Sequence, residues 1–426
     1  MSDPTWYHTE RPAEPARPTL EGSIDCDVAI VGGGIAGCST ALHLCEAGYR
    51  VVLLEAERIG AGASGRSGGQ TLAGLACGQS ALERLVGNAA ARAIFDITVE
   101  GVRLQRDLIA RHAIDCDYVP GWMLTATKPR QDLELRREYE TLTTRYAQRG
   151  LRWMTRDEVC ATIASTRYTS AIFDAEAGHL QPLAYVHGLA RAAAAAGARI
   201  FENTRALEHT RRSAPRAGLS IRTATGTVHC RAIALCGNAA LGNYAPPLAR
   251  KIVPVGTYVV ATEPLAADRA RALIKNDAAV SDANWILDYF RLSRDHRLLF
   301  GGRVSYSGLD HDRSGAATRA RMLKVFPQLA DVRVSHAWGG YIDITRNRAP
   351  HFGRLESDVY FLQGFSGHGL TLAGMAGRML AGAIAGTDAR FDVFARIPHR
   401  DFPGGTRLRR PALVLAMLWY RLRDLL

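Results

Sequence analysis

Several familiar sequence features are missing from this chain of 426 residues. Its eight cysteines include no Cys-x-x-Cys pair and no zinc-like spacing, so we expect no metal site and no disulfide framework, as in a reducing cytoplasm. No apolar run is long enough to span a bilayer. Residues 1–21 are proline-rich and polar, without the apolar stretch of a signal peptide. The sequence therefore predicts a cytoplasmic protein.

Lysine is also scarce, since arginine supplies almost all of the 53 basic residues and the formal net charge of +12. The arginines are spread along the chain, and no basic block is interleaved with aromatic residues, so we expect no nucleic-acid partner. We interpret the excess as a surface bias that attracts anionic substrates or membranes. With 47% hydrophobic and 22% charged residues, the composition is typical of a globular protein, and the length favours two domains.

The most informative stretch is residues 27–38. Val28 to Val31 form a short apolar run, as expected of a parallel strand covered on both faces. A glycine pattern G-x-G-x-x-G follows, with Ile35 and Ala36 at the start of the helix, and its glycines are Gly32, Gly34 and Gly37. The first permits a tight turn, the second lets a pyrophosphate approach the backbone, and the third lets helix and strand pack closely.

The continuation of the chain strengthens this interpretation. The predicted helix ends at Gly48, and a second strand, residues 51–54, ends on Glu55, where such folds hydrogen-bond a ribose hydroxyl. A glycine turn alone also occurs for purely structural reasons. Because strand, turn, helix, strand and terminal acid occur in order, we predict dinucleotide binding.

Three later regions complete the predicted architecture. The glycine-rich residues 60–69 imply backbone that passes close to a ligand, and Gly237 ends another apolar strand. From about residue 252 the pattern changes to long alternating strands, interrupted by a helix at 315–326. We therefore predict an α/β nucleotide-binding domain with an antiparallel-sheet domain inserted into it. Residues 1–23 would be an extended arm, pinned by Trp6 and Tyr7, and 218–230 a hairpin.

Three motifs together resemble the FAD-dependent D-amino acid oxidase superfamily, which includes sarcosine and glycine oxidases. They are the strand–turn–helix unit, the Gly-Ala-Ser-Gly-Arg-Ser-Gly-Gly stretch at 62–69, and Gly-Phe-Ser-Gly-His-Gly-Leu at 364–370. Longer stretches, among them Leu54-Glu-Ala-Glu-Arg-Ile-Gly and Phe402-Pro-Gly-Gly, are similar to the bacterial gamma-glutamylputrescine oxidoreductases. The resemblance implies a Rossmann-like FAD-binding domain of the glutathione reductase type with an interleaved substrate domain.

The predicted division follows from this fold. The nucleotide domain takes residues 24–116, 155–250 and 338–396, and the substrate domain takes 117–154 and 251–337. An arm, 1–23, precedes them, and a basic, apolar tail, 397–426, follows. The tail is interpreted either as a helix docked on the protein or as a helix in weak contact with a membrane surface.

The resemblance also implies the cofactor contacts. Glu55 would hold the adenosine ribose, Ala206 would contact adenine through its backbone, and residues 63–69 would pass along the pyrophosphate and flavin. Residues 367–371 would cap the pyrimidine end of the flavin, where a helix N-terminus stabilises the charge that reduction leaves. The full set of predicted FAD contacts is Gly32, Gly34, Ile35, Ala36, Gly37, Glu55, Ala56, Ala63, Ser64, Gly65, Arg66, Ser67, Gly68, Gly69, Ala206, Gly237, Gly367, Gly369, Leu370 and Thr371.

Departures from the family pattern bear on the chemistry. Gly340 stands where sarcosine oxidases carry the cysteine that binds flavin covalently, so we expect non-covalent FAD. Ile342 and Thr371 stand where relatives place an arginine and a lysine, so the reacting end of the substrate should be a plain amine, without a nearby carboxylate. Leu299 replaces a lysine that promotes the reaction with oxygen. His368 is interpreted as a positioning or electrostatic residue, with a general base as the alternative.

A predicted hairpin supplies further candidates. If residues 288–292 and 298–303 turn over Asp295 and His296, Leu292 lies opposite Leu299 and Asp288 opposite Arg303. Asp288 would then attract a substrate ammonium, and Arg303 would bind a distal carboxylate or orient Asp288. The alternatives are an ordinary salt bridge, or a loop one residue different in length that brings in Tyr289 and Arg291 instead.

The predicted activity is FAD-dependent oxidation of a primary amine to an imine and then an aldehyde. Gamma-glutamylputrescine is the first expected substrate, in putrescine catabolism, with O2 reduced to H2O2. The alternatives are a membrane-surface dehydrogenase that passes electrons to quinone, and a non-catalytic flavin-binding module. A NAD-linked dehydrogenase is disfavoured, because the 364–371 motif has no role in a simple nicotinamide fold.

Overall fold

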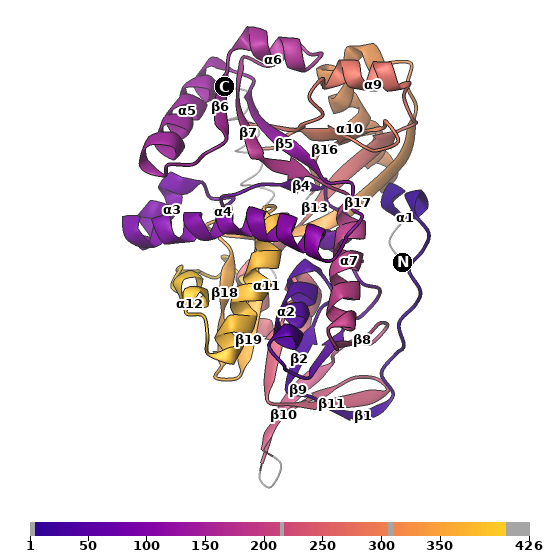
Figure 1. The fold of residues 1–426 in the computed structure, drawn as a ribbon, viewed down its shortest axis with the longest axis vertical. Helices are drawn as coiled ribbons and strands as arrows, with labels where there is room; N and C mark the ends of the chain where they lie inside the picture. Colours follow the sequence, from indigo (N-terminus) through magenta and orange to yellow (C-terminus); the bar gives the residue numbers. More distant parts are fainter. Residues whose placement is uncertain (1–4, 214–216, 306–310, 406–426) are drawn as a thin grey trace.

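The computed structural model describes residues 5–213, 217–305 and 311–405, with only the backbone at 303–305 and 311–314. Two sheets, of six and nine strands, dominate the fold, and a smaller four-stranded sheet covers one face of the six-stranded sheet (Figure 1). The helices α2 (Ile35–Glu46), α7 (Pro182–Ala195) and α11 (Gly369–Ala385) lie together beside the six-stranded sheet. This arrangement agrees with the predicted α/β fold.

The six-stranded sheet contains the strands of the predicted nucleotide-binding unit. Its order is β18 (His351–Glu356), β19 (Val359–Gln363), β12 (Ala232–Leu235), β2 (Val28–Val31), β3 (Val51–Leu54), β8 (Arg199–Phe201). All neighbours are parallel except β18 and β19. Along β2, Val28 and Ile30 pack toward the helices, whereas Ala29 and Val31 pack toward the small sheet. The apolar run therefore forms a strand buried on both faces, as predicted.

The small sheet has the order β1 (Gly22–Asp25), β11 (Gly226–Cys230), β10 (Gly218–Arg222), β9 (Glu208–Arg212). Strands β10 and β11 are antiparallel, with Arg222 opposite Thr227, so the predicted hairpin is confirmed.

The nine-stranded sheet carries the second core. Strands β13 (Ile252–Thr262), β16 (Leu298–Ser305) and β17 (Val334–Thr345) are long and antiparallel. The alternating pattern predicted β13 and β16, whereas β17 was not predicted as a strand. The helix α10 (His311–Val325) packs on them. The other strands of this sheet are β15 (Tyr289–Leu292), β14 (Ala279–Asp282), β5 (Val119–Ala126), β7 (Ser170–His179), β4 (Gln70–Thr71) and β6 (Leu151–Met154).

Shorter helices surround the two sheets. They are α3 (Gln79–Val86), α5 (Pro129–Glu140), α6 (Arg156–Thr162), α8 (Pro246–Ala249), α9 (Ala267–Leu273) and α12 (Arg390–Ala395). The long α4 (Asn88–Arg111) crosses below the nine-stranded sheet in Figure 1. Single turns add Ala63–Gly65, Asn238–Tyr244 and Pro327–Leu329, and a π-helical turn spans Thr141–Arg145. Within the described ranges, no helix combines the length and the apolar composition that a membrane crossing requires.

The domain division stays a prediction, but two strands bear on it. Strand β7, from the predicted nucleotide segment 155–250, pairs with β5 in the nine-stranded sheet, and β17 runs across the predicted boundary at 337 and 338. Both strands pair with partners far away in sequence, which periodicity does not reveal. Of the predicted tail, residues 406–426 lie outside the described part.

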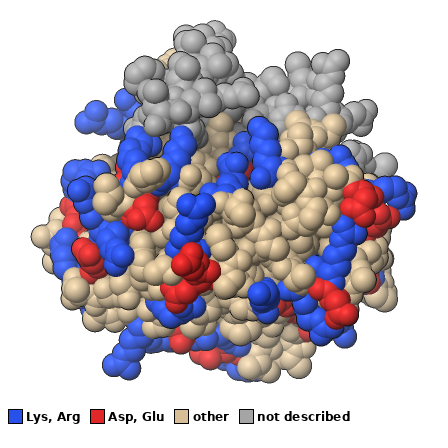
Figure 2. Space-filling view, turned by 90° about the horizontal axis from the view of Figure 1, so that it is seen from above, with Lys and Arg blue, Asp and Glu red and all other residues tan. Residues whose placement is uncertain are grey.

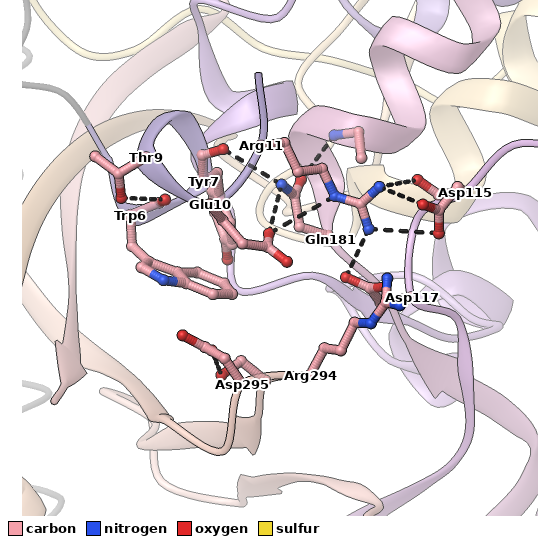
Figure 3. A network of polar contacts seen from close by, with 12 residues as sticks. Trp6, Tyr7, Thr9, Glu10, Arg11, Asp115, Asp117, Gln181, Arg294 and Asp295 are labelled. Atoms are coloured by element: carbon pink, nitrogen blue, oxygen red, sulfur yellow. Dashed lines mark hydrogen bonds and ion pairs between the residues drawn. The ribbon is translucent and has the colours of Figure 1, made fainter. Parts of the chain in front are cut away.

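The N-terminal arm contains the helix α1 (Trp6–Glu10), in which Trp6 and Tyr7 are buried. Figure 3 shows its polar anchors: Gln181 donates to the Glu10 carboxylate at 3.1 Å, and Arg11 pairs with Asp115 and Asp117 at 2.7 and 2.9 Å. The burial of Trp6 and Tyr7 confirms the expectation that they pin the arm, whereas the helix shows that the arm is not extended throughout.

Surface charge is mixed on the side viewed in Figure 2. Arginine and lysine side chains are interspersed there with aspartate and glutamate, and no single basic patch covers this face. The positive net charge is thus distributed over this face, as the even spacing of arginines along the chain led us to expect.

Candidate active site

A long cavity of about 1940 Å³ runs from the carboxyl ends of β2 and β3 to the nine-stranded sheet. Its walls come from both large sheets and from the glycine-rich segments between them. Among the predicted site residues, the structure brings the following together on this wall: Gly32, Gly34, Ile35, Ala36, Glu55, Ala56, Ala63, Ser64, Arg66, Ser67, Gly68, Gly69, Ala206, Gly237, Gly367, His368, Gly369, Leu370 and Thr371. Gly37 and Gly65 pack directly behind it.

At the end of the cavity beside β2 and β3, the turn after β2 requires glycine. We call this the nucleotide end, because the sequence predicts nucleotide binding at this turn. Gly32 has φ of +114°, and a Cβ there would lie 2.7 Å from the Gly237 nitrogen. A Cβ on Gly34 would lie 2.8 Å from the Ser64 Oγ, and one on Gly37 would collide with the Gly32 carbonyl oxygen. At these glycines the turn and helix α2 lie closer to other parts of the chain than a Cβ would allow. No side chain covers the backbone of the turn there, and we call this backbone facing the cavity the cradle.

Glu55 closes this cradle from the end of β3. Its carboxylate accepts hydrogen bonds from the Gly33 nitrogen at 2.6 Å and the Glu57 nitrogen at 2.9 Å. Burial raises the pKa of Glu55, while these two N–H groups lower it. The carboxylate is therefore held beside the glycine turn, where it lines the cavity.

Residues 66–69 are predicted to pass along the flavin, and we call them the flavin loop for this reason. They are held from four distant places. The Arg66 carbonyl accepts from Trp338 Nε1 at 2.9 Å, and the Ser67 carbonyl accepts from the Tyr7 hydroxyl at 2.7 Å. The Gly68 carbonyl accepts from Arg291 Nε at 2.7 Å, and the Gly69 carbonyl accepts from the Leu180 nitrogen at 2.8 Å. In a trans peptide the next N–H points away from the carbonyl. The N–H groups of Ser67, Gly68 and Gly69 are thus turned away from these anchors.

The third segment is the start of α11. Gly367 has φ of +93°, His368 is the N-cap, and Gly369 begins the helix. The positive end of the helix dipole therefore borders the cavity, where it favours negative charge. Burial, and secondly Arg348, lower the pKa of His368 to about 4, so this imidazole is neutral at pH 7. A weak base of this kind suits positioning better than proton abstraction.

The hairpin register that we predicted is wrong by one residue. Leu292 pairs with Leu298, and Arg291 pairs with Leu299. The loop between them contains His296 in the left-handed conformation, with φ of +64°, and it closes with Ser293 opposite Arg297. This odd-numbered loop shifts every side chain to the other face of the strand.

The shift removes the geometry proposed for Asp288. Its carboxylate is buried and accepts from Arg321 Nε at 2.6 Å, so it belongs to an ion pair with α10 and is absent from the described cavity wall. The backbone of Arg303 pairs with Tyr258, and its side chain lies outside the described part. The alternative residues take their place, because Tyr289 lines the cavity and Arg291 holds the flavin loop.

Sequence reasoning missed several residues in the part of the cavity that is formed by the nine-stranded sheet and the elements beside it. We call this part the substrate end, because the sequence predicts that the substrate domain contains this sheet. Trp285, Tyr341 and Arg348 line it, together with the acids Glu138, Asp174 and Asp282. Burial, and then Asp288, raise the pKa of Asp282 to about 7. Asp282 ends an apolar strand, and this position could have identified it from the sequence as a candidate site residue. Trp285 and Arg348 lie in loops, Glu138 lies on an exposed part of α5, and Tyr341 and Asp174 lie within the strands β17 and β7. Periodicity does not single out any of these positions as functional.

Comparisons with known proteins agree with this arrangement. A family model described as FAD dependent oxidoreductase (DAO) matches residues 27–383. The gamma-glutamylputrescine oxidoreductase of Escherichia coli K12 is 41% identical over 407 residues, which cover 95% of this chain and 94% of that protein. A probable oxidoreductase OrdL of Rhizobium meliloti is 35% identical over 99% of this chain and 97% of its own.

Among solved structures, the glycine oxidase from Geobacillus kaustophilus superimposes with a TM-score of 0.71. It is 22% identical, and the match covers 86% of this chain and 96% of that one. At this identity the likeness shows the fold, namely that of the glycine and amino acid oxidases.

Proposed function

Because the chain belongs to the family of FAD-dependent oxidoreductases, we propose that it oxidises the primary amine of gamma-glutamylputrescine to gamma-glutamyl-gamma-aminobutyraldehyde. The amine carbon would give up a hydride, and water would hydrolyse the resulting imine to the aldehyde and ammonia. The observation that carries this proposal is the 41% identity to the Escherichia coli enzyme over nearly the whole chain.

The described residues fit FAD. The glycine turn after β2 leaves room that a Cβ would fill, and Glu55 stands at the end of the next strand. We propose that these residues hold the adenosine and pyrophosphate, and that the flavin loop and the start of α11 hold the flavin. When bound, FAD supplies the hydride acceptor. The chain's own part is to orient the amine and to stabilise charge through the N-terminus of α11.

We further propose that FAD is bound without a covalent link. Gly340 stands at the position where sarcosine oxidases carry the cysteine that binds flavin, and a glycine offers no nucleophile. A Cβ there would lie 3.3 Å from the Arg66 Cβ, so the glycine also suits the close packing of Arg66. Denaturation should release free FAD from the protein.

The surroundings of the reacting end support a plain amine. Ile342 is apolar, and the Thr371 hydroxyl donates to the Gln105 amide oxygen at 3.1 Å within the protein. Neither residue offers the charge that a carboxylate on the reacting carbon would need. We therefore propose a primary amine whose reacting carbon is a methylene group.

Anaerobic mixing of the FAD-loaded protein with gamma-glutamylputrescine tests the proposal. We expect the flavin absorbance near 450 nm to bleach, whereas gamma-glutamyl-n-butylamide, which lacks the terminal amine, leaves it unchanged. Unchanged absorbance with gamma-glutamylputrescine, putrescine and longer polyamines would exclude amine oxidation and favour a non-catalytic module.

The electron acceptor is tested by admitting air afterwards. We propose O2 as the acceptor, and expect one H2O2 for each amine oxidised. Leu299, which is buried and apolar, favours the alternative of a quinone. Slow reoxidation by air, combined with fast reoxidation by a soluble quinone, would replace the oxidase by a dehydrogenase.

A further inference from the structure

Arg348 is a cation at the substrate end of the cavity that the proposed reaction has not used. Other arginines on the cavity wall have different surroundings: Arg66 is buried and donates to the Gly339 carbonyl at 2.6 Å, and Arg346 is exposed. Arg348 is half-buried, and its charge lowers the pKa of His368. A positive charge therefore lies next to the N-terminus of α11.

The backbone holds Arg348 there at a cost. Its φ is +60°, in the left-handed region that arginine rarely adopts, and its N–H donates to the Thr345 carbonyl at 3.1 Å. The turn is fixed by Thr345 Oγ1, which donates to the Ala349 carbonyl at 2.7 Å, and by Asn347, which donates to the Pro398 carbonyl at 2.8 Å. Such strain persists only where surrounding contacts determine the conformation, and it concentrates at functional sites.

The Arg348 guanidinium lies over the Trp285 ring, with 4.7 Å between its Cζ and the ring centroid. Trp285 belongs to the loop between β14 and β15, which is held by Asp282 and Arg321. Asp282 accepts from the nitrogens of Asn284 and Asp288 at 3.1 and 3.0 Å, and Arg321 donates to the Ile286 carbonyl at 2.8 Å. The Arg348–Trp285 pair thus joins the turn after β17 to the loop between β14 and β15, and both residues line the cavity.

This stacking is compatible with anion binding. Cation–π stacking engages the face of a guanidinium, whereas a carboxylate is bound by N–H groups at its edge, so one arginine can do both. The wall of the same cavity also carries acids, namely Glu138 on α5 and Asp174 on β7. A ligand with both an ammonium and a carboxylate group would match this mixture of charges better than a diamine would.

We propose that Arg348, stacked on Trp285, is a carboxylate subsite, and that the substrate is therefore an amine which also carries a carboxylate away from the oxidised carbon. This inference rests on the proposed function and narrows its substrate class. The glutamyl α-carboxylate of gamma-glutamylputrescine has this character. Free putrescine would instead bring a second ammonium toward the Arg348 charge.

Binding of two unreactive ligands to the FAD-loaded protein tests the subsite without turnover. 5-(Butylamino)-5-oxopentanoic acid carries the carboxylate, and N-butylpentanediamide replaces this carboxylate by a neutral carboxamide of the same shape; neither ligand contains an amine. Their dissociation constants are measured from the perturbation of the flavin spectrum. We expect the wild-type protein to bind the carboxylated ligand at least about tenfold more tightly, as charge-assisted hydrogen bonds allow.

Arg348→Gln should raise the dissociation constant of the carboxylated ligand by about 10- to 100-fold and change that of the other ligand by less than about threefold. For the carboxylated ligand, Arg348→Lys should have a dissociation constant between those of the wild type and Arg348→Gln, because a lysine keeps the charge without the planar guanidinium. Arg271→Gln, at an exposed position on α9 outside the described cavity wall, is the matched control and should behave as wild type.

Equal binding of the two ligands by wild type, or equal losses for Arg348→Gln with both, would overturn the subsite. Failure of gamma-glutamylputrescine to reduce the flavin would instead refute the proposed function, and carboxylate-selective binding that depends on Arg348 would still be measured.

Discussion

His179 shows at the scale of one residue how burial determines protonation in this protein. It lies on β7, is 2% exposed, and its Nε2 donates to the Asp277 carbonyl at 2.7 Å. Its Nδ1 has no hydrogen-bond partner among the described residues. A proton there would be a buried, unpaired charge, and burial accordingly lowers the pKa of His179 to about 3.

This shift predicts a pH dependence of stability. Below the unfolded pKa of about 6.5, the unfolded chain binds a proton that the folded state refuses. Stability from this residue is therefore present above pH 6.5 and is lost, by roughly 1.4 kcal/mol per pH unit, as the pH falls toward 3.

His179→Gln, which keeps a donor toward Asp277, should remove this part of the acid sensitivity. Between pH 6.5 and 5, urea unfolding of the wild type should lose roughly 2 kcal/mol more than unfolding of the variant. Parallel losses in the two proteins would show that His179 is protonated in the folded state.

At the scale of one element, the helix α1 acts as a brace for the flavin loop. It lies ahead of the nucleotide-binding unit in the sequence, yet Tyr7 reaches the Ser67 carbonyl and its ring packs edge-on against Trp338, with centroids 5.3 Å apart. Arg291 approaches the Tyr7 hydroxyl at 3.5 Å. Three segments far apart in the chain therefore converge behind one loop.

Tyr7→Phe should test this brace, because it removes only the hydroxyl and leaves the buried Ser67 carbonyl without its donor. We expect the dissociation constant for FAD to rise about tenfold, and the flavin absorbance of the loaded protein to shift. Thr9→Ala is the matched control on the same helix, since Thr9 donates within α1 to the Trp6 carbonyl. FAD affinities that are the same in both variants would limit α1 to a general structural role.

At the scale of the whole molecule, the cavity separates the two large sheets along much of their boundary. The nucleotide end belongs to the six-stranded sheet, and the substrate end belongs to the nine-stranded sheet. A ligand that fills this space would contact both bodies, so its binding free energy would add to the stability of the folded chain.

FAD should consequently stabilise the whole protein. At a free FAD concentration one hundred times its dissociation constant, we expect about 2.7 kcal/mol of added stability and a rise of several degrees in Tm. NAD, which shares only the adenosine and pyrophosphate parts, should raise Tm far less. A larger shift with NAD than with FAD would contradict the assignment of the cofactor.

Much of the nucleotide end could be predicted from sequence. Strand β2, the glycine turn, α2 and Glu55 follow from local patterns, because each depends on neighbours within a few residues. The start of α11 was found in the same way. Whether each predicted residue contacts FAD stays a prediction, although the cavity brings most of them onto one wall.

The substrate end could not be predicted to the same extent. One residue in the left-handed conformation, His296, shifts a whole strand, so that Arg291 replaces the expected partners beneath the flavin loop. Sequence spacing does not specify such a turn, and each one-residue error exchanges the two faces of a strand.

The sequence by itself determined the strand, the glycine turn and the helix at which we predict nucleotide binding, because a tight glycine turn and its helix are local structures. It also predicted which chemistry to expect. Only the tertiary structure decided which side chains line the cavity and which hold the flavin loop. Tyr7, Trp285, Arg291 and Arg348 come from four separate segments. Their convergence depends on long-range strand pairing and burial, which no short stretch of sequence encodes.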